Sequence, residues 1–131
     1  MKKNKKIKVN PWNPLPPYAQ LEEKLVRSKG FEELSITAKW LFVEFRLRFK
    51  GDNPRHIIFL ESEAKGIMNK RTFRTGVRLL IKLGFIDLVK RGGFYNQPSV
   101  YGLSNRWRSY GTKGFIEVDM DKLFPEILKK K

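Results

Sequence analysis

Hydrophobic residues recur along much of the chain at intervals of three and four, the spacing of amphipathic helices. The first such stretch predicts a helix over 18–30 that Gly30 ends. The second predicts a helix over 35–49 that Ser35 or Thr37 caps. Because apolar residues cover more than one side of this second helix, we expect it to be central, with Trp40 in the core.

Two further helical patterns follow. Residues 62–68 predict a brief helix that begins at Ser62 and Glu63. Asn69 is a good cap for a longer helix over 70–83, and Gly84 is placed to end it. The apolar side of this longer helix contains Phe73, Val77, Leu80 and Ile81. Its other side is basic, so the pattern predicts one face in the core and one face toward solvent or a partner.

Alternating and β-branched stretches predict the strands. Residues 55–60 suit a short strand, and 85–91 and 100–104 suit two strands joined by a polar, glycine-rich loop over 92–99. Beyond them, Trp107 is expected in the core and residues 115–118 could form a further strand. Residues 121–131 predict a terminal helix with Asp121 as its cap.

These elements divide the chain into four parts. Residues 1–17 are a basic, proline-rich tail or linker, because prolines this close together exclude a helix. An N-terminal helix over 18–30 precedes an α+β domain over 31–107, and 108–131 form a C-terminal extension. The tail lysines are either a solubilising segment or an arm that contacts phosphates, through Lys2, Lys3, Lys5 and Lys6.

Charge narrows the choice of partner. The 131 residues carry a formal net charge of +15, which attracts phosphate backbones or anionic surfaces. The excess is uneven, since residues 61–92 hold eight Lys and Arg against three acids, whereas 31–60 hold five against four. We therefore expect an acidic partner that meets the basic side of the 70–83 helix, through Lys70, Arg71, Arg74, Thr75, Arg78 and Lys82.

Composition excludes several classes of chemistry. The chain has no cysteine and one histidine, so thiolate zinc sites, cysteine nucleophiles and histidine-rich metal sites are not available. No run of about 18 apolar residues suits a membrane span. We therefore expect a cytoplasmic, nucleoid-associated protein with no cofactor and no catalytic residue.

The order of elements resembles the winged helix-turn-helix DNA-binding family, most closely its small phage and plasmid replication or regulatory proteins. The resemblance lies in the 35–49 helix, HIIFL, ESEAKGIM, NKRTFRTGVRLLIKLG and GFI, followed by YGLSNRW at 101–107. Gly66 lies one residue further from Thr72 than the usual turn of the family has it. The resemblance implies a three-helix core with a short strand and a β-hairpin wing.

The resemblance also implies how DNA would be bound. The start of the second helix of the motif lies nearest the bases in the major groove, which would bring Lys70, Arg71, Arg74 and Thr75 to base edges. Arg78 and Lys82 would then lie nearer phosphate. The wing would contact the backbone or an adjacent minor groove through Lys90, Arg91, Tyr95, Asn96 and Gln97.

The leading hypothesis is thus a non-enzymatic protein that binds double-stranded DNA in transcription regulation or replication initiation. Three alternatives stay open: an RNA-binding accessory protein, a protein-interaction winged helix, and a Mg²⁺-dependent nuclease using Glu117, Asp119 and Asp121. A homodimer, paired through the 18–29 helix or the terminal helix, is also left open.

Overall fold

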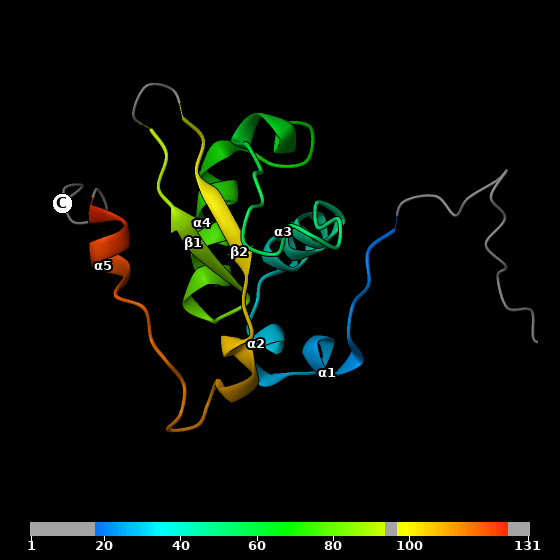
Figure 1. Ribbon diagram of the computed structural model, residues 1–131, viewed down its shortest axis with the longest axis vertical. Helices are drawn as coiled ribbons and strands as arrows, with labels where there is room; N and C mark the ends of the chain where they lie inside the picture. Colours follow the sequence, from blue (N-terminus) through cyan, green and yellow to red (C-terminus); the bar gives the residue numbers. More distant parts are fainter. Residues whose placement is uncertain (1–17, 94–96, 126–131) are drawn as a thin grey trace, which may run out of the picture.

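The computed structural model describes residues 18–93 and 97–125, which form an α+β fold (Figure 1). The predicted sites at Lys2, Lys3, Lys5, Lys6, Tyr95 and Asn96 lie outside the described residues. The elements in chain order are α1 (Glu23–Val26), α2 (Lys29–Glu32), α3 (Ile36–Leu47), η1 (Glu61–Ala64), α4 (Lys70–Lys82), β1 (Ile86–Lys90), β2 (Val100–Leu103), η3 (Arg106–Ser109) and α5 (Met120–Leu123).

Two long helices form the centre of the core, as the periodicity predicts. The Ser35 side chain accepts a hydrogen bond from the Ala38 amide at 3.1 Å and begins α3. In the same way Asn69 accepts from the Thr72 amide at 2.8 Å and begins α4. The helices pack closely because Gly76 of α4 leaves room for Leu41 of α3; a Cβ at Gly76 would lie 2.5 Å from a Leu41 methyl carbon.

The end of α4 sets the start of the hairpin. Gly84 has φ +92°, in the left-handed region that glycine enters without strain, and the Phe85 amide donates to the Leu80 carbonyl at 2.9 Å. The chain therefore leaves the helix directly into β1. Both the helix and its predicted stop at Gly84 are confirmed.

Strands β1 and β2 form an antiparallel hairpin, also as predicted. Ile86 pairs with Leu103 and Leu88 with Tyr101, and the register shifts between Leu88 and Lys90. The strand predicted over 55–60 is wrong as an extended element, because among the described residues there only Ile57 makes a bridge, to Tyr101. This bridge adds one pair of hydrogen bonds to the free edge of β2.

The N-terminal region differs from the prediction of one helix over 18–30. It forms two short helices, α1 and α2, because the Ser28 side chain accepts from the Phe31 amide and starts a new helix there. Gly30 does not end a helix. It lies buried inside α2, where a Cβ would stand 3.3 Å from the ring of Phe85.

Other local predictions are corrected too. The brief helix over 62–68 is a 3₁₀ turn, η1, in which the Glu63 carboxylate accepts from the Leu60 amide at 2.8 Å. Residues 115–118 form no strand. Helix α5 begins two residues earlier than expected, because Asp119, and not Asp121, accepts from the Lys122 amide.

The two tryptophans expected in the core have opposite environments. Trp107 is buried and stacks on Phe85, with ring centroids 6.1 Å apart. Trp40 is 44% exposed, so its core assignment is wrong. It lies on the side of α3 away from Ala38, Leu41, Phe42 and Phe45, which are buried.

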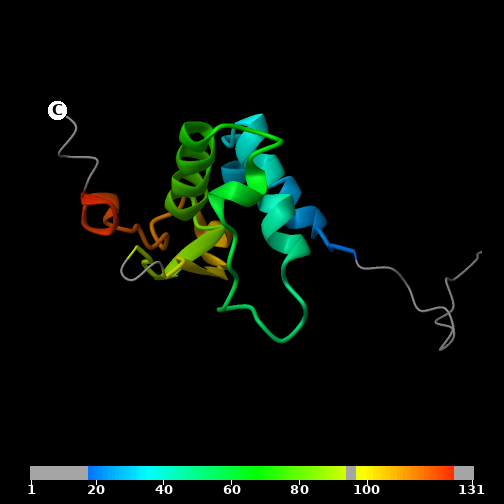
Figure 2. The same ribbon diagram turned by 90° about the horizontal axis from the view of Figure 1, so that it is seen from above.

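The arrangement puts α4 in the middle of the molecule. Helix α3 lies on one side of α4, and α5 lies on the other side, next to α4 and the hairpin (Figures 1 and 2). The C-terminal extension thus runs back past η3 to reach the side of the molecule that carries α4 and the hairpin.

Candidate nucleic-acid interface

A broad groove of about 1140 Å³ runs between α4, η1 and the hairpin. Helix α4 supplies one wall because its apolar residues face α3, which turns its basic residues toward the hairpin. The opposite wall consists of described residues that follow β1 and precede β2, together with Tyr101 of β2. The groove is lined by Phe59, Leu60, Glu61, Ser62, Lys70, Arg71, Phe73, Arg74, Thr75, Val77, Arg78, Arg91, Gly92, Gly93, Gln97, Ser99, Tyr101 and Phe124.

The charge of this groove is strongly positive. Lys70, Arg71, Arg74 and Arg78 come from α4 and Arg91 from the hairpin, against one carboxylate, Glu61. Cations gathered from two walls of a concave surface concentrate the field inside it. The groove therefore suits a polyanion better than the two smaller hollows do, whose linings hold fewer cations.

The single acid of the groove is engaged. Arg74 forms a two-point ion pair with Glu61 through its Nε and Nη2 atoms, the latter 3.2 Å from Oε1. This pair links α4 to η1. Lys70 and Arg71, at the start of α4, are exposed and also line the groove.

A residue that the sequence did not predict enters the groove from the C-terminal extension. The guanidinium of Arg78 lies 4.6 Å from the ring centroid of Phe124, and that of Arg91 lies 5.6 Å from it. Arg91 Nη1 also donates to the Leu123 carbonyl at 2.6 Å. Phe124 thus forms cation–π contacts with arginines from both walls.

Not all predicted contacts line the groove. Thr75 and Gln97 do, together with the five cations, but Lys82 and Lys90 do not. Lys82 is exposed near the end of α4, and Lys90 borders a separate hollow beside His56 and Val89. The structure therefore brings seven of the predicted residues together and leaves these two lysines apart.

The floor of the groove is aromatic. Phe59 packs edge to face against Phe73 and Phe45, and Phe45 packs against Tyr101, with centroids 5.2 Å apart in each pair. Burial raises the pKa of Tyr101 above its ordinary value of 10.0, against a smaller opposite effect of its hydrogen bond with Ser99. The neutral phenol is therefore favoured in the folded protein.

Outside the lining of the groove, one carboxylate holds the hairpin in place. Asp87 of β1 accepts from Arg55 Nη1 at 2.9 Å and from Arg106 Nε at 3.0 Å. Arg106 also donates to the Ile81 carbonyl at 2.7 Å near the end of α4. The only acid in the basic stretch over 69–96 thus has a structural role, fixing the hairpin relative to α4.

The acids proposed for a nuclease do not form a metal site. Across residues 18–93 and 97–125, no group of three His, Cys, Asp or Glu side chains could hold a metal ion. Asp119 instead caps α5. Over the same part of the chain, no helix is long and apolar enough to cross a membrane.

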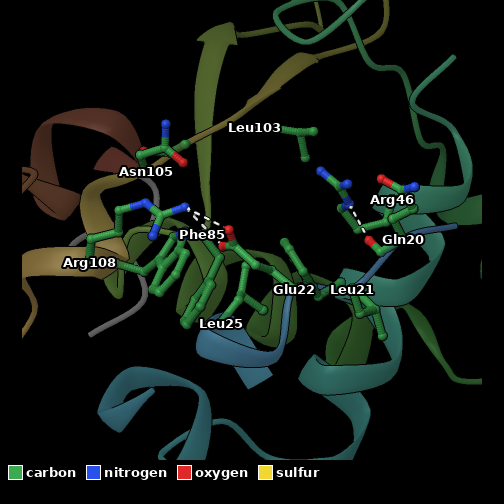
Figure 3. Close-up of a pocket in the computed structure, with 12 residues that line it drawn as sticks. Gln20, Leu21, Glu22, Leu25, Arg46, Phe85, Leu103, Asn105 and Arg108 are labelled. Carbon is green, nitrogen blue, oxygen red and sulfur yellow. Dashed lines mark hydrogen bonds and ion pairs between the residues drawn. The ribbon is translucent and has the colours of Figure 1, made fainter. Parts of the chain in front are cut away.

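A second, smaller hollow of about 310 Å³ lies on another part of the surface (Figure 3). Its two arginines fasten the N-terminal residues to the domain: Arg108 Nη2 donates to Glu22 at 2.8 Å, and Arg46 Nε donates to the Gln20 carbonyl at 3.0 Å. Both guanidiniums already have hydrogen-bond partners in the same chain. We therefore do not include this hollow in the candidate interface.

Comparison with known proteins adds no assignment: no family model, curated protein or solved structure matches the chain.

Proposed function

We propose that this chain is a non-enzymatic winged-helix protein that binds double-stranded DNA, in transcription regulation or replication initiation. In this proposal α4 is the recognition helix and the β1–β2 hairpin is the wing. The three-helix unit is then α3, the η1 turn and α4, with Ile57 supplying the short strand as a single bridge to β2.

One observation carries the proposal. The basic face of α4 and Arg91 of the hairpin line the same groove, although the sequence separates them by a full helix turn and a strand. A helix in the major groove can use Arg71 for paired hydrogen bonds to guanine and Thr75 for contact with a thymine methyl group. Arg78 is half-buried and Arg91 belongs to the hairpin, and phosphate is the partner we expect for both.

The position of Lys82 and Lys90 refines this hypothesis. Both are exposed but outside the groove, so we assign them to flanking phosphates and not to bases. Their loss should weaken binding to all sequences alike, whereas loss of Arg71 should also reduce discrimination between sequences.

The test is fluorescence anisotropy of a labelled duplex of random sequence over a series of salt concentrations. We expect the logarithm of affinity to fall linearly with the logarithm of salt concentration. The Arg71→Ala, Arg74→Ala, Arg78→Ala triple variant should bind more weakly, with a slope smaller by up to about 3. A matched triple variant removes three exposed cations outside the groove, Lys24, Arg27 and Lys113, and should retain most of the affinity.

Competition separates DNA from the RNA alternative. A-form RNA has a deep, narrow major groove that a helix cannot enter, so duplex DNA should compete far better than duplex RNA. Stronger competition by duplex RNA or by single strands would contradict the proposal, as would equal loss of affinity in the two triple variants.

A further inference from the structure

Helix α3 has two apolar sides, and the core uses only one of them. Ala38, Leu41, Phe42 and Phe45 are buried. At about 100° per residue, Ile36, Trp40, Val43 and Leu47 centre on the opposite side of the helix. Ile36 is 78% exposed, Trp40 44% and Leu47 37%, and Val43 is half-buried. We name these four residues the outer stripe.

The spacing of the outer stripe is that of a helix–helix seam. Its members follow one another at intervals of four, three and four residues, which is the a/d spacing of two heptads. A tryptophan and three aliphatic side chains in one line over a helix of about 18 Å make a contiguous apolar surface. The packing of the described residues does not account for that surface.

Charges beside the stripe indicate what covers it. Exposed Glu32 and Glu33 precede α3, whereas exposed Lys50 follows its end. Two copies of α3 that pack antiparallel bring the acidic end of each helix to the basic end of the other. The two helix dipoles then point in opposite directions, which also stabilises the pair. A parallel pair would instead bring like charges together at both ends.

We propose that the outer stripe is a dimer interface in which α3 packs antiparallel against α3 of a second copy. The twofold axis crosses the seam at the height of the Leu41–Phe42 peptide along α3, so Ile36 faces Leu47 of the second copy and Trp40 faces its Val43. This interface lies on the side of α4 away from α5 (Figure 2), so it leaves the basic groove open in both copies.

The proposal does not depend on the DNA-binding function, and it is tested without DNA. Sedimentation equilibrium of the full chain over a concentration series, in about 0.5 M NaCl to screen the net charge, should give a reversible monomer–dimer equilibrium. Trp40→Glu buries a charge in the seam and should raise the dimer dissociation constant at least about tenfold. Ile116→Glu, at a position 68% exposed elsewhere on the molecule, is the matched control and should dimerise as the wild type does.

Cysteine cross-linking tests the orientation, since the natural chain has no cysteine. A mixture of Ile36→Cys and Leu47→Cys chains should form a disulfide-linked pair under mild oxidation, and either variant alone should not. Efficient cross-linking of each variant with itself would overturn the antiparallel arrangement. A wild type that stays monomeric at every concentration, or equal disruption by Trp40→Glu and Ile116→Glu, would overturn the interface.

Discussion

Arg78 of α4 lies with its guanidinium 4.6 Å from the ring centroid of Phe124, and this contact joins the C-terminal extension to the basic groove. Arg91 approaches the same ring from the hairpin. In the proposed complex, a phosphate backbone that contacts both arginines would have to displace this ring. In the absence of DNA it gives the two guanidiniums a partner within the chain.

Removing this ring should strengthen DNA binding. Cation–π contacts at exposed sites contribute about 0.5–1 kcal/mol each, so losing both contacts in Phe124→Ala should raise the affinity for duplex DNA by about five- to thirtyfold. Anisotropy at fixed salt measures the change, and Ile116→Ala in the same extension is the control. A fall in affinity would mean that Phe124 belongs to the DNA contact and does not compete with it.

Loss of the carboxylate that holds the hairpin should destabilise the fold. In Asp87→Asn the side chain of Arg106, which is 14% exposed, loses its charged partner, so we expect the free energy of unfolding to fall by about 1–3 kcal/mol. Most of this effect belongs to Arg106, because Arg55 is more than half exposed. Urea denaturation measures the change, with Asp52→Asn in an exposed turn as control. Equal stability of the two variants would contradict a structural role for Asp87.

The junction between α4 and β1 requires glycine. Gly84→Ala places a Cβ at positive φ, and this Cβ would stand 2.7 Å from the Trp107 amide nitrogen. The left-handed conformation alone costs about 1–2 kcal/mol. Gly66→Ala is the matched control, because no atom lies within 4 Å of the added Cβ and its φ is not positive. A lower melting temperature is expected for the first variant and not for the second.

Tyr101 should make stability depend on alkaline pH. Its folded-state pKa is raised above 10.0 by burial, so the stability that comes from the neutral phenol is present below pH 10 and is lost as the pH rises further. The advantage in melting temperature of the wild type over Tyr101→Phe should therefore shrink above pH 10. A constant difference across this range would contradict burial of a neutral phenol.

The sequence predicts the features of the site that depend on local patterns. The cap at Asn69, the apolar side of α4 and the stop at Gly84 each need only a few neighbouring residues, and so does the order of helix and hairpin. The cations of α4 then have to lie opposite Phe73 and Val77. The hairpin is also predicted next to α4, because only a few residues around Gly84 connect the helix to β1.

Local sequence patterns do not predict the features that depend on contacts between distant residues. Periodicity finds apolar residues on α3 but does not tell which of two opposite sides is buried, so it wrongly predicts Trp40 in the core. Phe124 reaches Arg78 only because the extension returns past η3, and no local pattern encodes that path. The basic composition of this stretch predicts Lys90 in the wing surface. The strand register shifts between Leu88 and Lys90, and Lys90 lines a separate hollow outside the groove.

The central claim is that the start of α4 in the basic groove meets DNA, and two charge reversals test it most directly. Arg71→Glu and Lys113→Glu change the net charge equally, and both residues are exposed, but only Arg71 lines the groove. Duplex affinity by anisotropy should fall at least about tenfold for Arg71→Glu and less than about threefold for Lys113→Glu. Equal losses in the two variants would mean that net charge alone attracts DNA, and would contradict this account.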